Sequence, residues 1–463
     1  MNNIERNNGL EAVYEFFKGI FKELIFIFLA YNFLNKRFGN KIAMLILVVY
    51  IIFDILICFL EWYKTIYYFN EKSIFYQNGI VNITKREVPL SKINTIDMSQ
   101  GIFERIFKLT RIKIDTGNVK NDESEICLTV SSKRASEIKN ILIDKENEQI
   151  NTDKEKEYKL NLKSLIIYSL ISNAILKGLG LIWIFNKFLD DIKKFIKFDI
   201  LHYFKDIKLE EVNNKILGII IFIMGIIIIS ICLSIIYNCF KYYNFKTFLE
   251  ENKLNVSYGF VDRKNYSFDK KKIKGVHIKQ NFLMQILNMG TIEIESIGYG
   301  DKKGEKAILY PICNEKFQKE IISELLPEFC FTEQIYKSPT SACVRFILKK
   351  IIFSSIIFVF LIYKFKYAYV GLVLLIFVLI LGYMQYKNTA IGISDTLVYM
   401  SYNGFYKTKS IIKISAVQSS TISFDYFQKR MGLCDYTINI FGVFFGKNIK
   451  VKNMRYELIE SIK

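Results

Sequence analysis

Long apolar segments, separated by shorter segments of alternating character, dominate the pattern of hydrophobic and polar positions. Three segments, at 41–60, 216–237 and 367–386, hold about 20 mostly apolar residues each, the length of a helix that crosses a 30 Å hydrocarbon core. We therefore predict an integral membrane protein.

A weaker apolar stretch precedes each strong one. Charged residues such as Lys22 and Lys177 interrupt or border these stretches, so each alone would also fit an amphipathic or buried helix. Because a strong segment follows shortly after each, we interpret the six as helical hairpins. The three predicted hairpins are 16–60, 161–237 and 344–386.

Between these segments the chain repeats itself. Residues 79–114 and 259–294 align without a gap, and the matches include Gly79 with Gly259, Lys92 with Lys272, Gln100 with Gln280, Ile112 with Ile292 and Ile114 with Ile294. A more divergent third copy keeps Gly404, Phe427, Met431 and Leu433 but has Phe424 in place of the glutamine. The chain therefore contains three copies of one unit.

The periodicity inside each unit is that of β-strands. Ile112 and Ile114, for example, place alternate side chains on one face. The repeat glycines follow short apolar-aromatic runs, as in hairpin turns that need a positive φ. A short turn of helix or a tight corner is expected at FERIFKL, FLMQILNM and FQKRMGL, and a closing helix at 132–148, 314–326 and 453–462.

These motifs resemble a known family. A glycine, a basic or polar turn, I-x-x-I-x-x-x-Q, F-x-x-x-F-x-L and I-x-I are together similar to the bacterial pleckstrin-homology-like (PH-like) domain of the second type. Three such modules alternating with hairpins resemble the YdbT-like membrane proteins of Gram-positive bacteria. The resemblance implies cytosolic modules and a role in cell-envelope stress or antimicrobial resistance. Its motifs are packing and turn residues, which specify fold rather than activity.

The predicted fold class is an α+β membrane protein with six transmembrane helices. They form three hairpins that alternate with three PH-like β-barrel or sandwich modules, each capped by a C-terminal helix. The expected divisions are hairpin 16–60, module 62–150, hairpin 161–237, module 240–330, hairpin 344–386 and module 387–463.

A chain of three hairpins places every module on one side of the membrane. Lys36, Arg37 and Lys41 fill the first far-side loop, but more basic residues flank the modules, which favours modules in the cytosol of a multi-pass cell-membrane protein. The far-side segment 187–215 mixes charges with apolar residues. We interpret it as an amphipathic helix at the outer interface, with a solvated loop as the alternative.

The composition and the motifs limit which ligands and which kinds of activity are expected. The net charge of +19 would fit binding to nucleic acid, binding to an anionic membrane surface, or a role in orienting the chain in the membrane. No zinc-finger or RNA-binding signature is present, so no nucleic-acid partner is expected. The eight cysteines lack a C-x-x-C pair and the two histidines, His202 and His277, lack partners at metal spacing. Nucleotide, hydrolase and metalloprotease motifs are missing. We predict no enzyme, cofactor or metal.

Two groups of residues are candidate sites. Basic residues could meet anionic lipid headgroups, although a solvated strand and loop face explains them equally well: Lys270, Lys271, Lys272, Lys274, Lys85 and Arg86. Asp54 lies inside a predicted span, with Asn173 and Lys177 as potential partners. An intramembrane carboxylate is a functional candidate, and a structural contact between helices is the alternative.

Our function hypothesis is a non-enzymatic membrane scaffold. Its three modules would bind one another, the inner leaflet with its anionic lipids, or a partner, through sheet edges and grooves. The expected protein partner is a smaller membrane protein with a single PH-like module, or a second copy of this chain. The alternative is a transporter or lipid-handling protein that uses the polar residues of the helical bundle.

Overall fold

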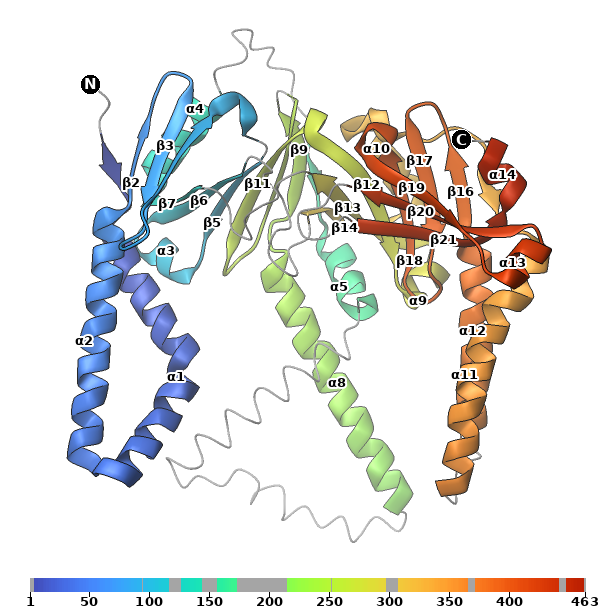
Figure 1. Ribbon diagram of the computed structural model, residues 1–463, viewed down its shortest axis with the longest axis horizontal. Coiled ribbons are helices and arrows are strands. Elements are labelled where there is room, and N and C mark those ends of the chain that lie inside the picture. Colours follow the sequence, from blue (N-terminus) through green and yellow to red (C-terminus); the bar gives the residue numbers. More distant parts are fainter. Residues whose placement is uncertain are drawn as a thin grey trace. The chain divides into compact units, whose positions relative to one another are not determined.

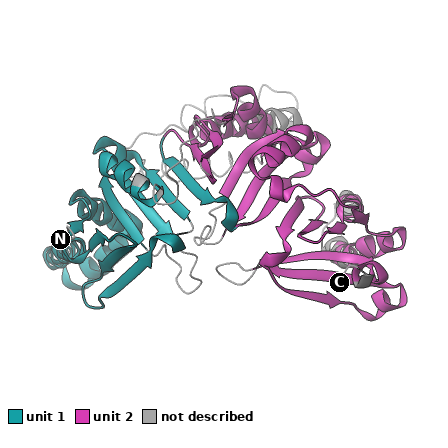
Figure 2. Cartoon of the chain, turned by 90° about the horizontal axis from the view of Figure 1, so that it is seen from above, with its two compact units in different colours: residues 1–155, 261–272, 297–305 teal, residues 156–260, 273–296, 306–463 magenta. Residues whose placement is uncertain are grey.

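The computed structural model describes residues 4–93, 95–115, 126–143, 156–172, 215–250, 252–296, 307–364, 371–440 and 447–461. Long helices alternate with antiparallel β-sheets along the chain (Figure 1). The chain divides into two compact units (Figure 2). Unit 1 holds the first helix pair and the first repeat, together with residues 261–272 of the second repeat.

In unit 1, two helices that meet at Gly39 pack against each other and lead into two sheets. The helices are α1 (Leu10–Phe38) and α2 (Asn40–Lys64). The first sheet has the order β1-β2-β3-β4: Glu5–Arg6, Ile66–Phe69, Ser73–Asn78 and Thr84–Pro89. The second contains β7-β6-β5-β11: Ile126–Ser131, Leu109–Asp115, Thr95–Gln100 and Arg263–Asp269. Helix α4 (Ser132–Ile143) follows β7.

Unit 2 contains the helices α5 (Leu162–Ile171), α8 (Lys215–Lys241), α11 (Cys343–Lys364) and α12 (Gly371–Asn388). One sheet has the order β14-β13-β12-β18-β17-β16-β15: Ala307–Asn314, Met289–Ser296, Ile273–Gln280, Lys407–Lys413, Leu397–Tyr402, Ala390–Ile393 and Tyr336–Lys337. Strands β10 (Lys253–Tyr258), β9 (Lys246–Glu250) and β8 (Tyr158–Lys159) pair in that order. A last sheet is β19-β20-β21: Val417–Ser423, Leu433–Ile440 and Lys447–Arg455. Helices α10 (Glu315–Leu325) and α14 (Tyr456–Ser461) close the second and third repeats.

Alternation along the strands builds the cores. In the first repeat, Ile74 and Val88 from one sheet pack with Ile112 and Ile114 from the other, and Ile138 of α4 joins them. The third repeat has the same arrangement: its core joins residues of β16, β17 and β18 to those of β20 and β21 and to Ile459 of α14. In each of these repeats, three strands from one sheet and strands from a second sheet thus pack over one apolar core, which a C-terminal helix closes.

Neighbouring repeats share strand pairing, which the sequence pattern did not predict. Strand β11 of the second repeat pairs antiparallel with β5 of the first, and β18 of the third pairs in the same way with β12 of the second. We call each of these pairings a seam. Because the strands are joined by backbone hydrogen bonds, each seam fixes the register between two repeats.

A buried polar cluster spans the β12–β18 seam. The imidazole of His277 on β12 lies 2.8 Å from the hydroxyl of Ser410 on β18 and 2.5 Å from Oε2 of Glu295 on β13. Ser410 is 0% and His277 2% exposed. Hydrogen bonds in such an apolar setting are costly to lose, so the cluster favours one pairing register over its neighbours.

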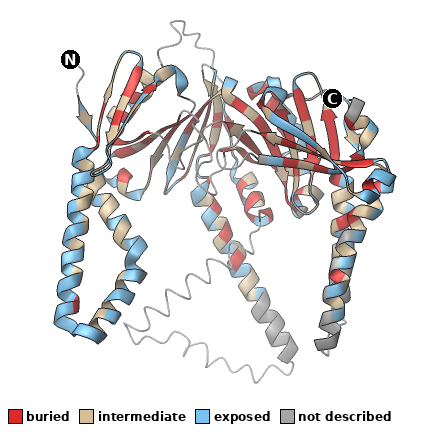
Figure 3. Cartoon of the chain, in the orientation of Figure 1, coloured by how far each residue is buried: buried red, intermediate tan, exposed pale blue. Residues whose placement is uncertain are grey.

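The long helices differ from core helices in their exposure. Most of α2 is exposed or half-buried, whereas buried residues are concentrated in the strands that follow it (Figure 3). The exposed residues of α2 include many large apolar side chains, such as Leu45, Phe53 and Leu56. Among the described residues, Asn40–Lys64 and Met224–Lys241 are helices long and apolar enough to cross a membrane. The described helix pairs α1–α2 and α11–α12 occupy two of the three predicted hairpins. The predicted outer segment lies outside the described residues, apart from Lys215 at its end.

The turn chemistry of the repeat glycines is only partly as expected. Gly79 and Gly259 have φ values of 102° and 111°, as predicted, but in the third repeat Asn403 carries the positive φ, at 69°. Gly404 is required for a different reason, since a Cβ there would lie 2.9 Å from the carbonyl oxygen of Leu381 on α12. The prediction of a positive φ was therefore wrong at Gly404.

The seam cluster generates a stability prediction. Replacing His277 with alanine removes the group that joins Glu295 to Ser410, and a buried polar group left with fewer partners costs about 1–3 kcal/mol. We expect His277→Ala to lower the thermal unfolding midpoint in detergent. Lys271→Ala, at an exposed position, is the control, with a change within about 0.5 kcal/mol. Equal midpoints for the two variants would contradict the stabilising role of the cluster.

Candidate functional site

The six strands of each repeat are β2–β7, β9–β14 and β16–β21. A short helix with exposed apolar side chains follows the fourth strand of every repeat, which is β5, β12 or β19. The helices are α3 (Ile102–Ile106), α9 (Phe282–Ile286) and α13 (Tyr426–Arg430), and they confirm the short helical turns expected from the sequence. Their exposed apolar residues, with those that directly follow, are Ile102, Ile106, Phe107, Leu283, Ile286, Leu287, Tyr426, Phe427 and Met431. We call these three short helices the apolar tips. Apolar groups recurring at one place in three repeats indicate a contact surface.

Each apolar tip adjoins the first helix of the pair that precedes its repeat. In the first repeat, the guanidinium of Arg111 lies 3.1 Å from Glu15 on α1 and 3.6 Å from Glu104 on α3. In the second, the side chain of Asn281, which caps α9, donates to the carbonyl oxygen of Ile171 on α5 over 2.7 Å. The tips are therefore held at the bases of the helix pairs.

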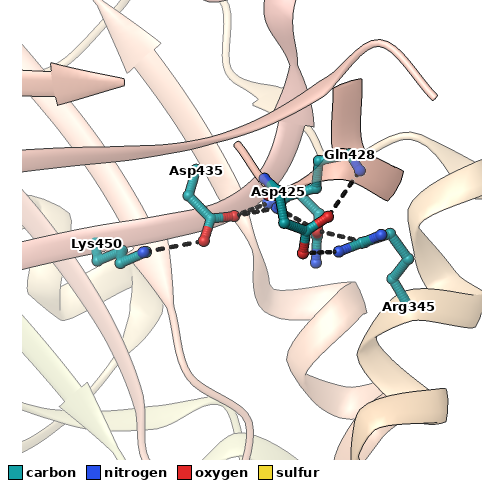
Figure 4. A network of polar contacts seen from close by, with 6 residues as sticks. Arg345, Asp425, Gln428, Asp435 and Lys450 are labelled. Carbon is teal, nitrogen blue, oxygen red and sulfur yellow. Dashed lines mark hydrogen bonds and ion pairs between the residues drawn. The ribbon is translucent and has the colours of Figure 1, made fainter. Parts of the chain in front are cut away.

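In the third repeat this joint is a polar network (Figure 4). Arg345 in the first turn of α11 forms an ion pair with Asp425, which caps α13 in a reciprocal capping box with Gln428. The Gln428 amide donates to Asp435 over 2.6 Å and to Asn453 over 2.8 Å. The helix pair, the tip and strands β20 and β21 are thus connected through side chains that satisfy one another.

A basic pocket of about 490 Å³ opens beside this network. Its lining is Arg345, Phe346, Lys350, Gln385, Gln428, Asp435, Lys450, Lys452 and Asn453. Arg345 is neutralised by Asp425, and Lys450 by Asp435 at 3.0 Å. Among the described residues, Lys350 and Lys452 have no carboxylate partner, and Lys350 donates to the carbonyl oxygen of Leu381 over 3.2 Å. The pocket therefore keeps an excess of positive charge that suits a phosphate group.

The sequence carries a signal for this pocket that a count of charges beside the spans overlooks. Lys450 and Lys452 alternate along β21, so they lie on one face of that strand. Arg345 and Lys350 lie about one turn apart at the start of α11, where their position alone suggests only charges that flank a span. What the sequence could not supply is the packing of α11 beside β21, which depends on contacts between segments distant in the chain, such as Arg345 with Asn453.

The predicted basic residues are dispersed. Lys270, Lys271 and Lys272 form a turn of 3-10 helix between β11 and β12, and Lys274 lies on β12. Lys272 is engaged structurally, since its ammonium donates to the carbonyl oxygen of Ile93 over 2.6 Å. Lys85 and Arg86 lie within strand β4, not in the turn before it.

Lys407 on β18 shows how burial acts on a basic residue in this fold. Burial, with Lys409 nearby, lowers the pKa of the Lys407 ammonium to about 8. An anion that approached this side chain would favour its charged form. Lys407 lies opposite Gln280 in the seam.

The intramembrane candidates are only partly described. Asp54 is half-buried on α2, and one carboxylate oxygen lies 4.0 Å from the position that a Cβ on Gly19 of α1 would take. A separate contact joins the two helices, in which the Tyr50 hydroxyl donates to Glu23. Asn173 and Lys177 lie outside the described residues, so their pairing with Asp54 stays a prediction.

Serine, histidine and glutamate meet at the β12–β18 seam, as they do in hydrolases. Here Ser410 is completely buried, so a substrate has no route to its hydroxyl. The thiols of Cys127 and Cys434 are unsuited to attack, because burial raises the pKa of each to about 11, and a reactive cysteine needs a lowered value. In the described part of the chain, no three histidine, cysteine or carboxylate groups could hold a metal ion.

The glutamine shared by the first two repeats has a structural role. Gln100 donates to the carbonyl oxygen of Leu109 over 3.1 Å, and Gln280 donates to the equivalent oxygen of Met289 over 2.7 Å. Both bonds tie the end of the fourth strand to the start of the fifth. Phe424 in the third repeat lacks this bond, and there the Gln428 network supports the corner instead.

Comparison with known proteins identifies the family. The family model described as Bacterial PH domain matches residues 24–146, 200–326 and 345–462. The UPF0699 transmembrane protein YdbT of Bacillus subtilis (strain 168) is 24% identical over 457 residues, which cover 93% of this chain and 90% of that protein. No solved structure matches. Together with the two long apolar helices, these matches indicate a membrane-associated protein. The chain belongs to the bacterial PH domain family and contains three copies of that domain.

Proposed function

We propose that this chain is a non-enzymatic, multi-pass membrane scaffold. Six spans, arranged as three hairpins, hold three PH-like modules against the cytosolic leaflet of the cell membrane. The observation that carries the proposal is the recurrence of an apolar tip at the base of a helix pair in all three repeats. A side chain such as Ile286, 61% exposed, loses its unfavourable contact with water when it enters the headgroup and acyl boundary.

The tips and the spans support each other in this proposal. An interfacial contact by one short apolar segment is weak, because its buried area is small. A helix pair that crosses the membrane beside the tip keeps the local concentration of lipid high, so weak contacts suffice to orient the module. Three tips in one chain would then hold three modules in a fixed orientation toward the leaflet.

The basic pocket supplies the polar half of the contact. It lies where α11 leaves the third repeat, which is the depth of the lipid phosphates if α11 enters the membrane. Each basic residue near an anionic surface contributes roughly 1 kcal/mol. We propose that Lys350 and Lys452 bind the phosphate of an anionic phospholipid, while Arg345 and Lys450 keep the pocket in shape through their own ion pairs.

The free thiols of the chain support a cytosolic location of the modules. All eight cysteines are free, as is usual in a reducing compartment. Basic residues also flank the module ends of the helices, among them Lys64, Lys241 and Arg345, in the sense of the positive-inside rule.

Depth-dependent fluorescence quenching tests the apolar tips. Tryptophan is placed at a tip by Ile106→Trp, Ile286→Trp or Phe427→Trp, and the full-length protein is reconstituted in vesicles that contain lipids brominated near the headgroup. We expect each added tryptophan to be quenched beyond the level of the parent protein, because the tip residues lie in the interface. Lys271→Trp, at an exposed position outside the tips, is the matched control. Tip signals no more quenched than this control would refute the proposed orientation.

Lipid retention tests the pocket. The full-length protein is reconstituted with a mixture of phosphatidylglycerol and phosphatidylcholine, extracted in mild detergent and examined by native mass spectrometry. We expect the Lys350→Ala/Lys452→Ala variant to lose retained phosphatidylglycerol, with affinity about tenfold to thirtyfold lower for a loss of roughly 2 kcal/mol. Lys85→Ala/Lys271→Ala removes two exposed lysines that do not line the pocket and serves as control. Unchanged retention in the pocket variant, or an equal loss in the control, would contradict the assignment.

A further inference from the structure

The two seams follow one rule. In the first, β11 pairs with β5 so that Phe268 lies opposite Thr95 and Lys264 opposite Ser99. In the second, β18 pairs with β12 so that Ile412 lies opposite Gly275 and Thr408 opposite Lys279. The repeat alignment makes these positions equivalent. A fourth strand therefore accepts the third strand of the following repeat, antiparallel and in a fixed register.

Strand β19 is the fourth strand of the third repeat, and no described strand pairs with its outer edge. It is equivalent to β5 and β12, since Ser420 faces Ile438 on β20 as Ile96 faces Ile114 on β6. Within the described residues, β19 is the outer strand of the order β19-β20-β21. The edge that carries a seam in the first two repeats is thus open in the third.

Exposure shows what the missing strand would cover. Asp97 and His277, which occupy the same position in β5 and β12, are 9% and 2% exposed in their seams. Thr421 takes that position in β19 and is exposed, as are Gln418, Ser419 and Ser420. The residues of β19 are therefore open to solvent where their equivalents are covered by a neighbouring strand.

The β19 edge also lacks the usual protection against pairing. Exposed edge strands are commonly blocked by charged residues, especially lysine, or by proline. The sequence of β19, VQSSTIS, contains neither. A register irregularity lies between Val417 and Ser419, which leaves Ser419–Ser423 as a regular stretch able to receive another strand.

Strand β4 has the complementary property at the first repeat. It is the third strand of that repeat, equivalent to β11 and β18: Val88 faces Ile74 on β3 as Ile412 faces Val398 on β17. Among the described strands, β4 ends the order β1-β2-β3-β4, so its outer edge is unpaired there. Pro89 follows the six positions that pair in the two seams, so it does not interrupt the equivalent stretch.

We propose that β19 of one copy of this chain pairs with β4 of a second copy. The pairing is antiparallel, with Ser419 opposite Val88 and Ser423 opposite Thr84, and it continues the seams between the repeats. The interface joins two different surfaces, so it is heterologous and forms a closed ring or an open row of copies. The inference goes beyond the proposed scaffold function, because single copies could bind the leaflet without associating.

Disulfide trapping tests the register. Ser423→Cys and Thr84→Cys are introduced into separate, differently tagged copies of the full-length protein, which are co-reconstituted in vesicles and oxidised with copper phenanthroline. Residues opposite each other in antiparallel strands have Cα atoms about 4.5–5.5 Å apart, within the range that a disulfide spans. We expect a mixed dimer that carries both tags. Thermal unfolding midpoints near that of the parent verify that each variant is folded.

Two controls complete the experiment. Lys85→Cys replaces Thr84→Cys one residue out of register, which turns the thiol to the opposite face of the strand, so its dimer is expected to be lost. The parent protein, with its eight native cysteines, is oxidised in parallel to reveal background products. Absence of the mixed dimer, equal yields from the two registers, or capture of a different protein by Ser423→Cys in native membranes would overturn the proposal.

Discussion

Pairing between the fourth strand of one repeat and the third strand of the next is the constraint on which the rest of the structure depends. The first and the third PH-like repeats each have an apolar core of their own. The seams add main-chain hydrogen bonds between repeats, and register in such pairing is specified residue by residue.

The seams also give structural roles to several polar residues that the sequence alone would assign to a functional site. His277, Ser410 and Glu295 serve to fix a register, although their chemistry alone would suggest catalysis. Lys272 binds a backbone oxygen instead of projecting toward a ligand. The positive charge that stays without a carboxylate partner in the described pocket is found at Lys350 and Lys452, beside the helix pair of the third repeat. The charge distribution is thus consistent with a protein that faces the membrane with its helix-proximal ends.

Much of the fold could be predicted from local patterns in the sequence. Strand alternation, the glycine turns and the short helix after the fourth strand depend on residues within one repeat, and the structure confirms antiparallel sheets closed by a terminal helix in each. The seams could not be inferred in the same way, because β11 and β18 read as ordinary strands and their partners lie more than 120 residues away. The basic pocket could not be predicted for the same reason, because its lining residues come from α11 and β21, which are distant in the sequence. At Gly404 the pattern predicted a turn with a positive φ, whereas the structure requires glycine there because the backbone packs closely against α12.

Amide hydrogen exchange of the full-length protein in lipid nanodiscs tests the central claim, that neighbouring repeats are joined by shared strand pairing. Strands hydrogen-bonded on both sides exchange only through the larger openings of the structure. If the seams persist in the membrane, peptides from β5 and β11, and from β12 and β18, will exchange as slowly as peptides from the inner strands β6 and β13. Rapid exchange of β11 and β18 amides facing the seams, with slow exchange elsewhere in the same sheets, would show that the repeats fold without joining and would contradict the claim.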